Sequence, residues 1–363
     1  MNQDFWRKKK VLLTGHTGFK GSWLSLWLQS LGTELVGYSL SPPTHPNLYD
    51  LAQVERGMES IRGDILDLEH LRRAVREHRP EIIFHMAAQS LVRRSYADPV
   101  GTYATNVMGT VNVLEAIRDT PAVQAVVIVT TDKCYENCED QRAYRETDRL
   151  AGFDPYSSSK ACAELVTAAF RKSFFMAKNR EVTTGVASAR AGNVIGGGDW
   201  AADRLIPDVM RAVLEGKELL VRNPDAVRPW QHVMDPLCGY LMLAEKVCED
   251  PVRFSESWNF GPDESETLPV SAVLERLGAL WGPRALWHHD GGSQPHEARY
   301  LKLDCTKAKT ELGWLPQWNL NLALEATVRW YQAQQLHQDV RALTLQQIRT
   351  YQSALNLPTS VRE

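Results

Sequence analysis

Tyr156 and Lys160 are the residues whose types and spacing point most directly to catalysis. A helix would place the phenol and the ammonium group on one face, because residues four positions apart are neighbours there. A free tyrosine has a pKa of about 10, and a neighbouring cation favours its ionised form. The pair therefore predicts that Tyr156 takes a proton from a hydroxyl group near neutral pH.

Glycines recur in the sequence Thr-Gly-His-Thr-Gly-Phe-Lys-Gly at residues 14–21, where a predicted strand ends and a predicted helix begins. Glycine permits a tight turn and lets the backbone approach a pyrophosphate, whose negative charge is attracted by the helix N-terminus. A plain tight turn is the alternative, but this turn opens a series of strand and helix units. The motif predicts a dinucleotide site at Gly15, Thr17, Gly18, Phe19 and Gly21.

The end of the second predicted strand, residues 37–40, lacks the carboxylate that usually binds the ribose of a dinucleotide. No arginine follows within residues 41–51 to hold a 2′-phosphate, so the sequence favours NAD over its phosphorylated form. An oxidised nicotinamide would add a second positive charge near Tyr156. Asp64 and Ile65 are expected at the adenine edge, and a helix cap is the alternative role for Asp64.

The elements that must position these residues alternate between short apolar runs and longer amphipathic stretches. Runs rich in branched residues predict strands at 10–14, 34–38, 81–85, 125–130 and 182–188. Amphipathic stretches predict helices at 19–31, 67–78, 100–118 and 156–177, the last preceded by Asp154-Pro155 as a cap and first-turn pair. This alternation is typical of the α/β class, with a doubly wound, Rossmann-type parallel sheet.

The sequence pattern changes beyond Arg190, where three consecutive glycines and several prolines and tryptophans separate predicted helical segments. We predict helices near 203–216, 233–248 and 269–280, and a helical tail at 319–355. Residues 1–190 are expected to form an NAD-binding domain that carries the catalytic residues. Residues 191–363 are expected to form mainly a smaller α/β substrate-binding lobe, with segments that return to the first domain.

The composition is that of an ordinary globular protein and argues against several functional classes. The chain has 363 residues, with 41 basic and 44 acidic side chains, and this balance gives no strong attraction for nucleic acid. No apolar run approaches the roughly 18 residues of a membrane span, and no signal sequence begins the chain. The six cysteines are too dispersed to predict disulfides or a metal site. The expected location is the cytoplasm.

Further motifs follow along the chain: Ala87-Ala88-Gln89 after a predicted strand, Asn106 in a predicted helix, and Thr131-Asp132-Lys133 after another strand. With the glycine turn and the Tyr156–Lys160 pair, these motifs resemble the extended short-chain dehydrogenase/reductase family over nearly the whole chain. The resemblance implies that Ala87, Ala88, Gln89 and Asn106 belong to the NAD site. It also implies that Tyr156 and Lys160 are the catalytic pair and contact NAD.

Within this family, nucleotide-sugar 4,6-dehydratases carry Thr-Asp-Glu where this sequence has Thr131-Asp132-Lys133. The lysine, and the sequences at residues 15–23, 38–44, 196–200 and 228–232, resemble the subgroup of these dehydratases that acts on CDP-glucose. The expected reaction converts CDP-glucose to CDP-4-keto-6-deoxy-glucose and water.

The resemblance also implies how the reaction divides among the residues. Tyr156 is expected to take the proton of the sugar C4 hydroxyl, while Thr131 forms a hydrogen bond to the C4 oxygen. The hydride that leaves C4 is later added at C6. Asp132 would protonate the departing C6 hydroxyl, which requires a raised pKa. Lys133 would remove the C5 proton, and the alternative is that Lys133 stabilises the enolate while another group or water is the base.

Six residues of the second half align with the family's positions for the sugar nucleotide: Asn193, Arg204, Arg228, Asn259, Arg299 and Tyr300. Arginine suits a diphosphate because its planar guanidinium donates two parallel hydrogen bonds. Trp200 and Trp230 could stack on the base or sugar, and core packing is the alternative role for each. The family also implies a homodimer that pairs the helices at 100–118 and 156–177 of two subunits.

Two other functions stay open at this stage. A sugar-nucleotide 4-epimerase of the same family would return hydride to C4, and it would need no acid such as Asp132 for a departing hydroxyl. A dinucleotide-sensing protein without catalytic activity could share the fold, but it would have no need for the set of Thr131, Tyr156 and Lys160.

Overall fold

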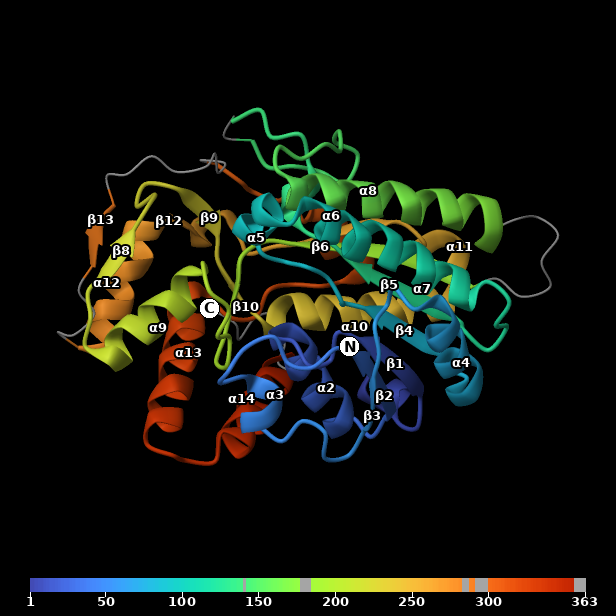
Figure 1. Ribbon diagram of the computed structural model, residues 1–363, viewed down its shortest axis with the longest axis horizontal. Coiled ribbons are helices and arrows are strands. Elements are labelled where there is room, and N and C mark those ends of the chain that lie inside the picture. The colour runs from blue at the N-terminus through green and yellow to red at the C-terminus, as the bar shows by residue number, and fades with distance from the viewer. Residues whose placement is uncertain (140–141, 177–183, 283–286, 291–299, 356–363) are drawn as a thin grey trace.

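A seven-stranded parallel sheet forms the centre of the molecule, with its strands in the order β11-β6-β5-β4-β1-β2-β3 (Figure 1). The computed structural model describes residues 1–139, 142–176, 184–282, 287–290 and 300–355. The strands of the sheet are β1 Lys10–Thr14, β2 Glu34–Ser39, β3 Glu59–Arg62, β4 Ile82–His85, β5 Ala125–Val129, β6 Gly185–Ala191 and β11 Ser257–Phe260. The order reverses between β1 and β4, which is where open α/β sheets bind ligands. The predicted Rossmann-type α/β fold is confirmed.

Helices cover both faces of this sheet, which is why its central strands are buried along their whole length. On one face lie α4 Leu68–His78, α7 Gly109–Ile117 and α8 Pro155–Phe170 (Figure 1). On the other face lie α2 Phe19–Ser30 and α10 Met234–Glu249. Helix α2 is buried on nearly all sides, because α10 and the C-terminal helix α14 Val340–Leu355 also pack against it.

The helix predicted at 100–118 is divided into three pieces in the structure. It begins as α6 Pro99–Tyr103, continues as the π-turn η1 Ala104–Met108 and ends as α7. The helix predicted at 156–177 likewise ends in a π-turn, η3 Arg171–Phe175. At its start, Asp154 and Ser157 form a reciprocal capping box, with Pro155 in the first turn as expected.

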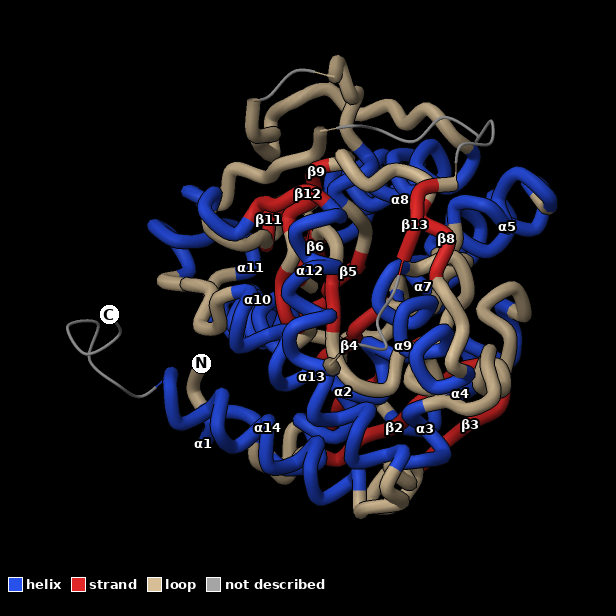
Figure 2. The backbone as a smooth tube through the Cα atoms, turned by 90° about the vertical axis from the view of Figure 1, so that its left-hand side faces the viewer, coloured by secondary structure: helices blue, strands red, loops and turns tan. Residues whose placement is uncertain are grey.

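The second half of the chain contributes to the central sheet as well as to a smaller, separate part. Strand β11 pairs with β6, and α10 packs on β5 and β6. The smaller part contains α9 Leu205–Glu215, α12 Val270–Trp281 and the short strands β8 Leu219–Val221, β9 Val227–Pro229, β12 Thr267–Pro269 and β13 Trp287–His289 (Figure 2). A division at residue 190 therefore cuts through the packing of the sheet, and the predicted domain boundary stays a prediction.

Short elements complete the described chain. The helices and turns are α1 Gln3–Trp6, α3 Leu48–Leu51, α5 Val92–Ala97, η2 Asp132–Cys134, α11 Pro251–Phe254, η4 Glu264–Glu266, η5 Ala308–Leu312 and α13 Leu320–Gln335. The remaining strands are β7 Val194–Ile195 and β10 Gln231–His232. Within the described ranges, no helix has both the length and the apolar character needed to cross a membrane.

Candidate active site

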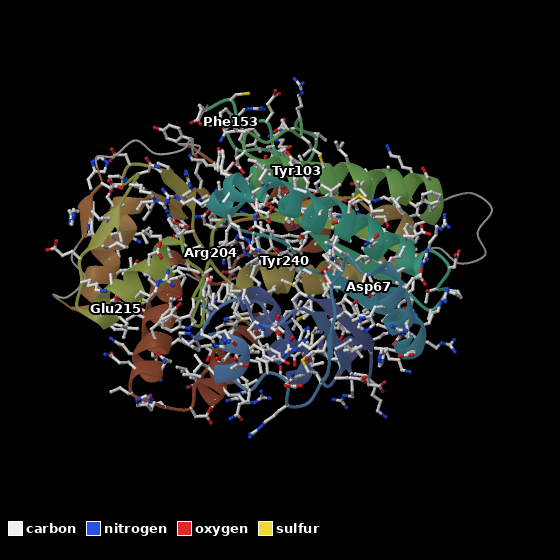
Figure 3. The ribbon with its side chains drawn as sticks, viewed as in Figure 1. Asp67, Tyr103, Phe153, Arg204, Glu215 and Tyr240 are labelled. Atoms are coloured by element: carbon white, nitrogen blue, oxygen red, sulfur yellow. The ribbon has the colours of Figure 1, made fainter. Side chains whose placement is uncertain are left out.

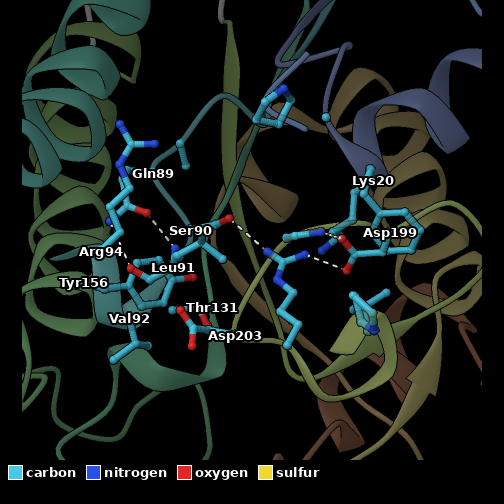
Figure 4. Close-up of a pocket in the computed structure, with 18 of the residues that line it drawn as sticks. Lys20, Gln89, Ser90, Leu91, Val92, Arg94, Thr131, Tyr156, Asp199 and Asp203 are labelled. Carbon is cyan, nitrogen blue, oxygen red and sulfur yellow. Dashed lines mark hydrogen bonds and ion pairs between the residues drawn. The ribbon is translucent and has the colours of Figure 1, made fainter. Parts of the chain in front are cut away.

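A cavity of about 650 Å³ opens at the carboxyl ends of β1, β4 and β5, between the sheet and the smaller part of the molecule (Figure 4). The glycine turn and the Tyr156–Lys160 pair both line it, although they are far apart in the sequence. The predicted site residues that line it are Gly15, Thr17, Gly18, Phe19, Gly21, Asp64, Ile65, Ala87, Ala88, Gln89, Thr131, Asp132, Lys133, Tyr156, Lys160, Asn193, Arg204 and Arg228.

The glycine turn has the geometry that a dinucleotide requires. Gly15 has a φ of +79°, and a Cβ on it would lie 2.7 Å from the backbone nitrogen of Ala87. A Cβ on Gly21 would lie 2.1 Å from the Gly15 carbonyl oxygen, so α2 can approach the turn only with glycine there. Gly18 caps α2 without a side-chain hydrogen bond, which leaves the first N–H groups of the helix open to an anion. These residues fit a bound pyrophosphate.

Asn106 does not line the cavity but holds the loop that does. Its Oδ1 accepts a hydrogen bond from the Gln89 N–H, and its Nδ2 donates to the Gln89 carbonyl and to the Ser159 hydroxyl. The residue lies in the π-turn η1, and such turns in a helix often mark functional sites. The structure thus gives Asn106 a supporting position behind the predicted cofactor loop.

The predicted ribose end of the cavity has hydroxyl groups where a carboxylate is usual. Thr17 Oγ1 and Ser39 Oγ lie 2.8 Å apart, and the Thr17 hydroxyl also donates to the Leu40 carbonyl. Strand pairing brings Arg62 beside Ser39, and its guanidinium donates to the Leu40 carbonyl, but Arg62 is not among the residues that line the cavity. Asp64 lines the cavity, and its Oδ1 accepts from the Leu66 N–H in a local turn, whereas Asp67 is the residue that caps α4.

Tyr156 and Lys160 both face the cavity from α8, but their side chains make different contacts (Figure 4). The Lys160 amine donates to the Val129 carbonyl at 3.1 Å. Burial raises the pKa of Tyr156 to about 12, against the opposing effects of the Thr131 hydroxyl and of Arg204. Burial lowers the pKa of Lys160 to about 8. In the protein chain alone, burial dominates the pKa of Tyr156, and the main groups that lower this pKa are Thr131 and Arg204 rather than Lys160.

Asp132 has the surroundings of a carboxyl group that holds its proton. It is 1% exposed, and its Oδ1 accepts a hydrogen bond from the Thr131 hydroxyl at 3.0 Å. Its Oδ2 is buried without a hydrogen-bond partner within the described structure. Burial raises its pKa, although Lys133, Thr131 and Arg228 act in the opposite direction. A Cβ on Gly192 would lie 2.7 Å from Oδ2, so the glycine leaves the room in which this oxygen lies.

Arg204 connects the two walls of the cavity from the start of α9, and Figure 3 shows it at the centre of the molecule near Tyr240. Its Nη1 donates to Asp199 and its Nη2 to the hydroxyl of Ser90, each at 2.9 Å. Ser90 belongs to the loop after β4, on the opposite wall (Figure 4). Arg228 and Asn193 also line the cavity. Two of the arginines predicted to bind the diphosphate, Arg204 and Arg228, thus lie in one cavity.

Two predicted substrate residues, Asn259 and Tyr300, are not brought to this cavity. Asn259 is fully buried in β11, where its amide accepts from the Tyr135 hydroxyl and donates to the carbonyls of Tyr144 and Asp304. These bonds hold the sheet edge to the neighbouring loops and leave the side chain no free group for a substrate. Tyr300 pairs through its backbone with Val227 and does not line the cavity. Arg299 lies outside the described residues.

The cavity also contains polar residues that sequence reasoning missed. Lys20 donates to the Tyr240 hydroxyl at 3.0 Å, and burial lowers its pKa to about 7. Arg93, Arg94 and Asp199 line the walls. Lys20 lies inside the glycine motif and Asp199 follows the three glycines, so both motifs pointed to them, whereas the arginines stand in a loop without a motif.

Comparison with known proteins assigns the chain to a family. The profile of the family described as GDP-mannose 4,6 dehydratase matches residues 12–261. The chain belongs to this family. Among curated members, CDP-glucose 4,6-dehydratase of Salmonella typhimurium is 50% identical over 355 residues, which cover 98% of this chain and 99% of that protein. The dTDP-glucose 4,6-dehydratase of Xanthomonas campestris is 30% identical and covers 88% of this chain and 92% of its own length.

Solved structures of dehydratases and epimerases share the fold of this family member. A dTDP-glucose 4,6-dehydratase from Bacillus anthracis, crystallised with NAD, has a TM-score of 0.76 and 26% identity, covering 92% of this chain and 99% of its own. A UDP-glucose 4-epimerase from Thermotoga maritima has a TM-score of 0.75 and 22% identity, covering 90% of this chain and 99% of its own. The second similarity shows the fold alone.

Proposed function

We propose that the protein is a CDP-glucose 4,6-dehydratase, which converts CDP-glucose to CDP-4-keto-6-deoxy-glucose and water with NAD as cofactor. The observation that carries the proposal is the 50% identity, over 98% of the chain, to a protein of that name. The glycine turn and the raised pKa of Asp132 support it from the geometry. When bound at the glycine turn, NAD would supply the reversible hydride acceptor that oxidation at C4 and reduction at C6 require.

The oxidation at C4 uses two residues of α8, Tyr156 and Lys160, together with Thr131, which follows β5. Tyr156 accepts the C4 hydroxyl proton, and Thr131 donates a hydrogen bond to the same oxygen. Lys160 supplies the positive charge that favours the tyrosinate, together with the charge of the oxidised cofactor. Because burial, as the largest cause, raises the pKa of Tyr156 to about 12, the positive charges of Lys160 and of a bound oxidised cofactor would act to lower it toward the range in which the base forms.

Elimination of water then uses the two residues that follow Thr131. Asp132 protonates the C6 hydroxyl as it leaves, and its unpartnered buried Oδ2 is the oxygen that carries this proton. Lys133 lines the same cavity and removes the C5 proton. In the alternative, Lys133 stabilises the enolate and another group or water is the base.

Arg204, Arg228 and Asn193 bind the sugar nucleotide in this proposal. Arg204 would exchange Ser90 on the opposite wall for the diphosphate, because a guanidinium binds a bidentate anion more strongly than a neutral hydroxyl. The enzyme acts as a cytoplasmic homodimer, in which α7 and α8 of two subunits pack together. The exposed apolar side chains Val100, Met108, Leu165 and Phe174 along η1, α6, α8 and η3 support this interface.

The test incubates the purified protein with NAD and, in separate reactions, with CDP-, dTDP-, UDP- and GDP-glucose, and follows product mass and alkaline absorbance. Loss of one water from CDP-glucose, with the other three unchanged, is the expected result. Turnover of a different nucleotide would retain the dehydratase reaction and overturn the base assignment. An unchanged mass with an inverted C4 centre would identify an epimerase.

A further inference from the structure

A buried ion pair lies behind the catalytic helix, outside the cavity. Arg190 on β6 places its Nη2 2.8 Å from the Glu164 carboxylate on α8, and their side chains are 3% and 1% exposed. Neither residue lines the cavity. A buried pair of this kind adds little to stability by itself, because desolvation of both charges offsets their attraction. Its position one helical turn after Lys160 points to a different role.

The Glu164 carboxylate is held in one orientation by donors from three strands or their ends. Besides Arg190, it accepts hydrogen bonds from the hydroxyls of Thr130 at 2.5 Å, Ser188 at 2.6 Å and Ser257 at 3.1 Å. Burial opposes ionisation, but Arg190 and these hydroxyls hold the pKa of Glu164 below its ordinary value. The group is therefore a fixed negative charge, attached to the same framework as Thr131.

Lys160 requires such a charge because its amine is buried, with 6% of the residue exposed. The titratable groups that face it are Tyr156 and Glu164 on α8, Cys134 on η2, His85 on β4 and Lys20 on α2. Among the groups opposing the effect of burial on the pKa of Lys160, Glu164 is the strongest. His85 is itself neutral, because burial lowers its pKa to about 3.

We propose that Glu164 is a positioning residue: its carboxylate, oriented by Arg190, keeps Lys160 an ammonium ion next to Tyr156. The role in catalysis rests on the proposed function, whereas the charge state of Lys160 does not. When Tyr156 is ready to act as the base, only one of the two titratable protons of the Tyr156–Lys160 pair remains. That proton must be on the lysine, so that the tyrosine is ionised. Without the Glu164 charge, the proton is lost from the lysine at lower pH, and the tyrosine keeps its own.

The first experiment measures the protonation of Lys160 without turnover. Acetic anhydride acetylates only the neutral amine, and peptide mass spectrometry gives the acetylated fraction of Lys160 as a function of pH. We expect Glu164→Gln to move this titration to lower pH by about one unit or more. Glu146→Gln is the matched control, because Glu146 is also an acidic residue next to Arg190, which donates to its backbone carbonyl, but Glu146 is not among the groups that act on the pKa of Lys160. It should titrate as the wild type does.

Two further variants keep the test decisive if Glu164→Gln does not fold. Glu164→Asp retains the charge and should keep the wild-type titration of Lys160. Glu164→Gln combined with Arg190→Met leaves no unpaired buried arginine, and it should still shift the titration downward, since Arg190 does not face Lys160. Unchanged titrations in both carboxamide variants would overturn the proposal.

Activity on CDP-glucose gives the catalytic part of the test. The alkaline limb of the kcat profile reports the loss of the Lys160 proton, so Glu164→Gln should move this limb to lower pH and lower kcat about tenfold at neutral pH. KM for the sugar nucleotide should stay the same. A fall in kcat without any shift of the limb would reduce Glu164 to a structural role. Failure of the wild type to turn over would overturn the proposed function, whereas the acetylation result would stand.

Discussion

Asp132 and Lys133 are adjacent in the chain, yet the proposed reaction gives them separate steps, and isotope exchange can separate them. In deuterated water, Asp132→Asn should still exchange the C5 hydrogen of the substrate, since Lys133 removes it, while release of water falls by about 10² to 10³. Lys133→Met should lose the exchange as well. Exchange that persists in Lys133→Met would show that another group is the base. Lys302→Met is the control, because Lys302 pairs with Glu264 and does not line the cavity.

The buried carboxyl group of Asp132 should lower the stability of the folded protein at neutral pH. The pKa of Asp132 is raised in the folded state by burial, so its stabilising contribution is present at acid pH and is lost as the pH rises above about 4. Asp132→Asn should therefore have a higher Tm than the wild type at pH 8, and the difference should vanish near pH 4. A lower Tm at pH 8 would contradict a protonated Asp132. The comparison needs only thermal denaturation at several pH values.

At the scale of elements, the exposed leucine of α8 should determine the oligomeric state. Leu165 is 60% exposed in the single subunit, and an arginine there would place a charge in the proposed four-helix interface. Leu165→Arg should be a monomer by light scattering at concentrations where the wild type is a dimer. Leu336→Arg is the control, because that leucine is 67% exposed at the end of α13, away from this face. Equal masses for all three proteins would contradict the interface.

Most elements of the sheet could be predicted from sequence, and the exceptions have physical reasons. The apolar runs of β1, β4 and β5 are buried on both faces, so their composition alone identifies them. Strand β3 is an edge strand with the sequence Glu-Ser-Ile-Arg, which has no apolar run to detect. Strand β11 joins the sheet from residues 257–260, and only tertiary packing reveals its partner.

The sequence likewise predicts some residues of the site correctly and misses or misplaces others. Motifs located the glycine turn and the residues after β5, because turn geometry and chemistry restrict the residue types there. Asn259 was assigned to the substrate on alignment alone, but a fully buried amide is committed to its neighbours. No pattern marked Glu164 in the sequence, since its importance arises from Arg190, which β6 brings to it.

At the scale of the whole molecule, the sheet cannot be separated from the second half of the chain. A fragment of residues 1–190 would expose the apolar face of β5 and β6 that α10 covers, and it would lack β11. We expect this fragment to aggregate or to be cleaved rapidly by protease, and to bind no NAD. A fragment of 1–261, which restores α10 and β11, should be more resistant. A stable, NAD-binding 1–190 fragment would support the predicted domain boundary instead.

Helix α14 packs against α2, with Tyr351 edge-on to Trp27, and Arg341 donates to backbone carbonyls of residues 52 and 53. The helix that carries the glycine turn is thus completed by some of the last residues of the described chain. During synthesis on the ribosome, the turn emerges early but must wait until α14, which ends at Leu355, has emerged before its supporting helix is in place. Capture of the cofactor therefore has to wait for α14, and the nascent chain reaches that point with α2 still uncovered.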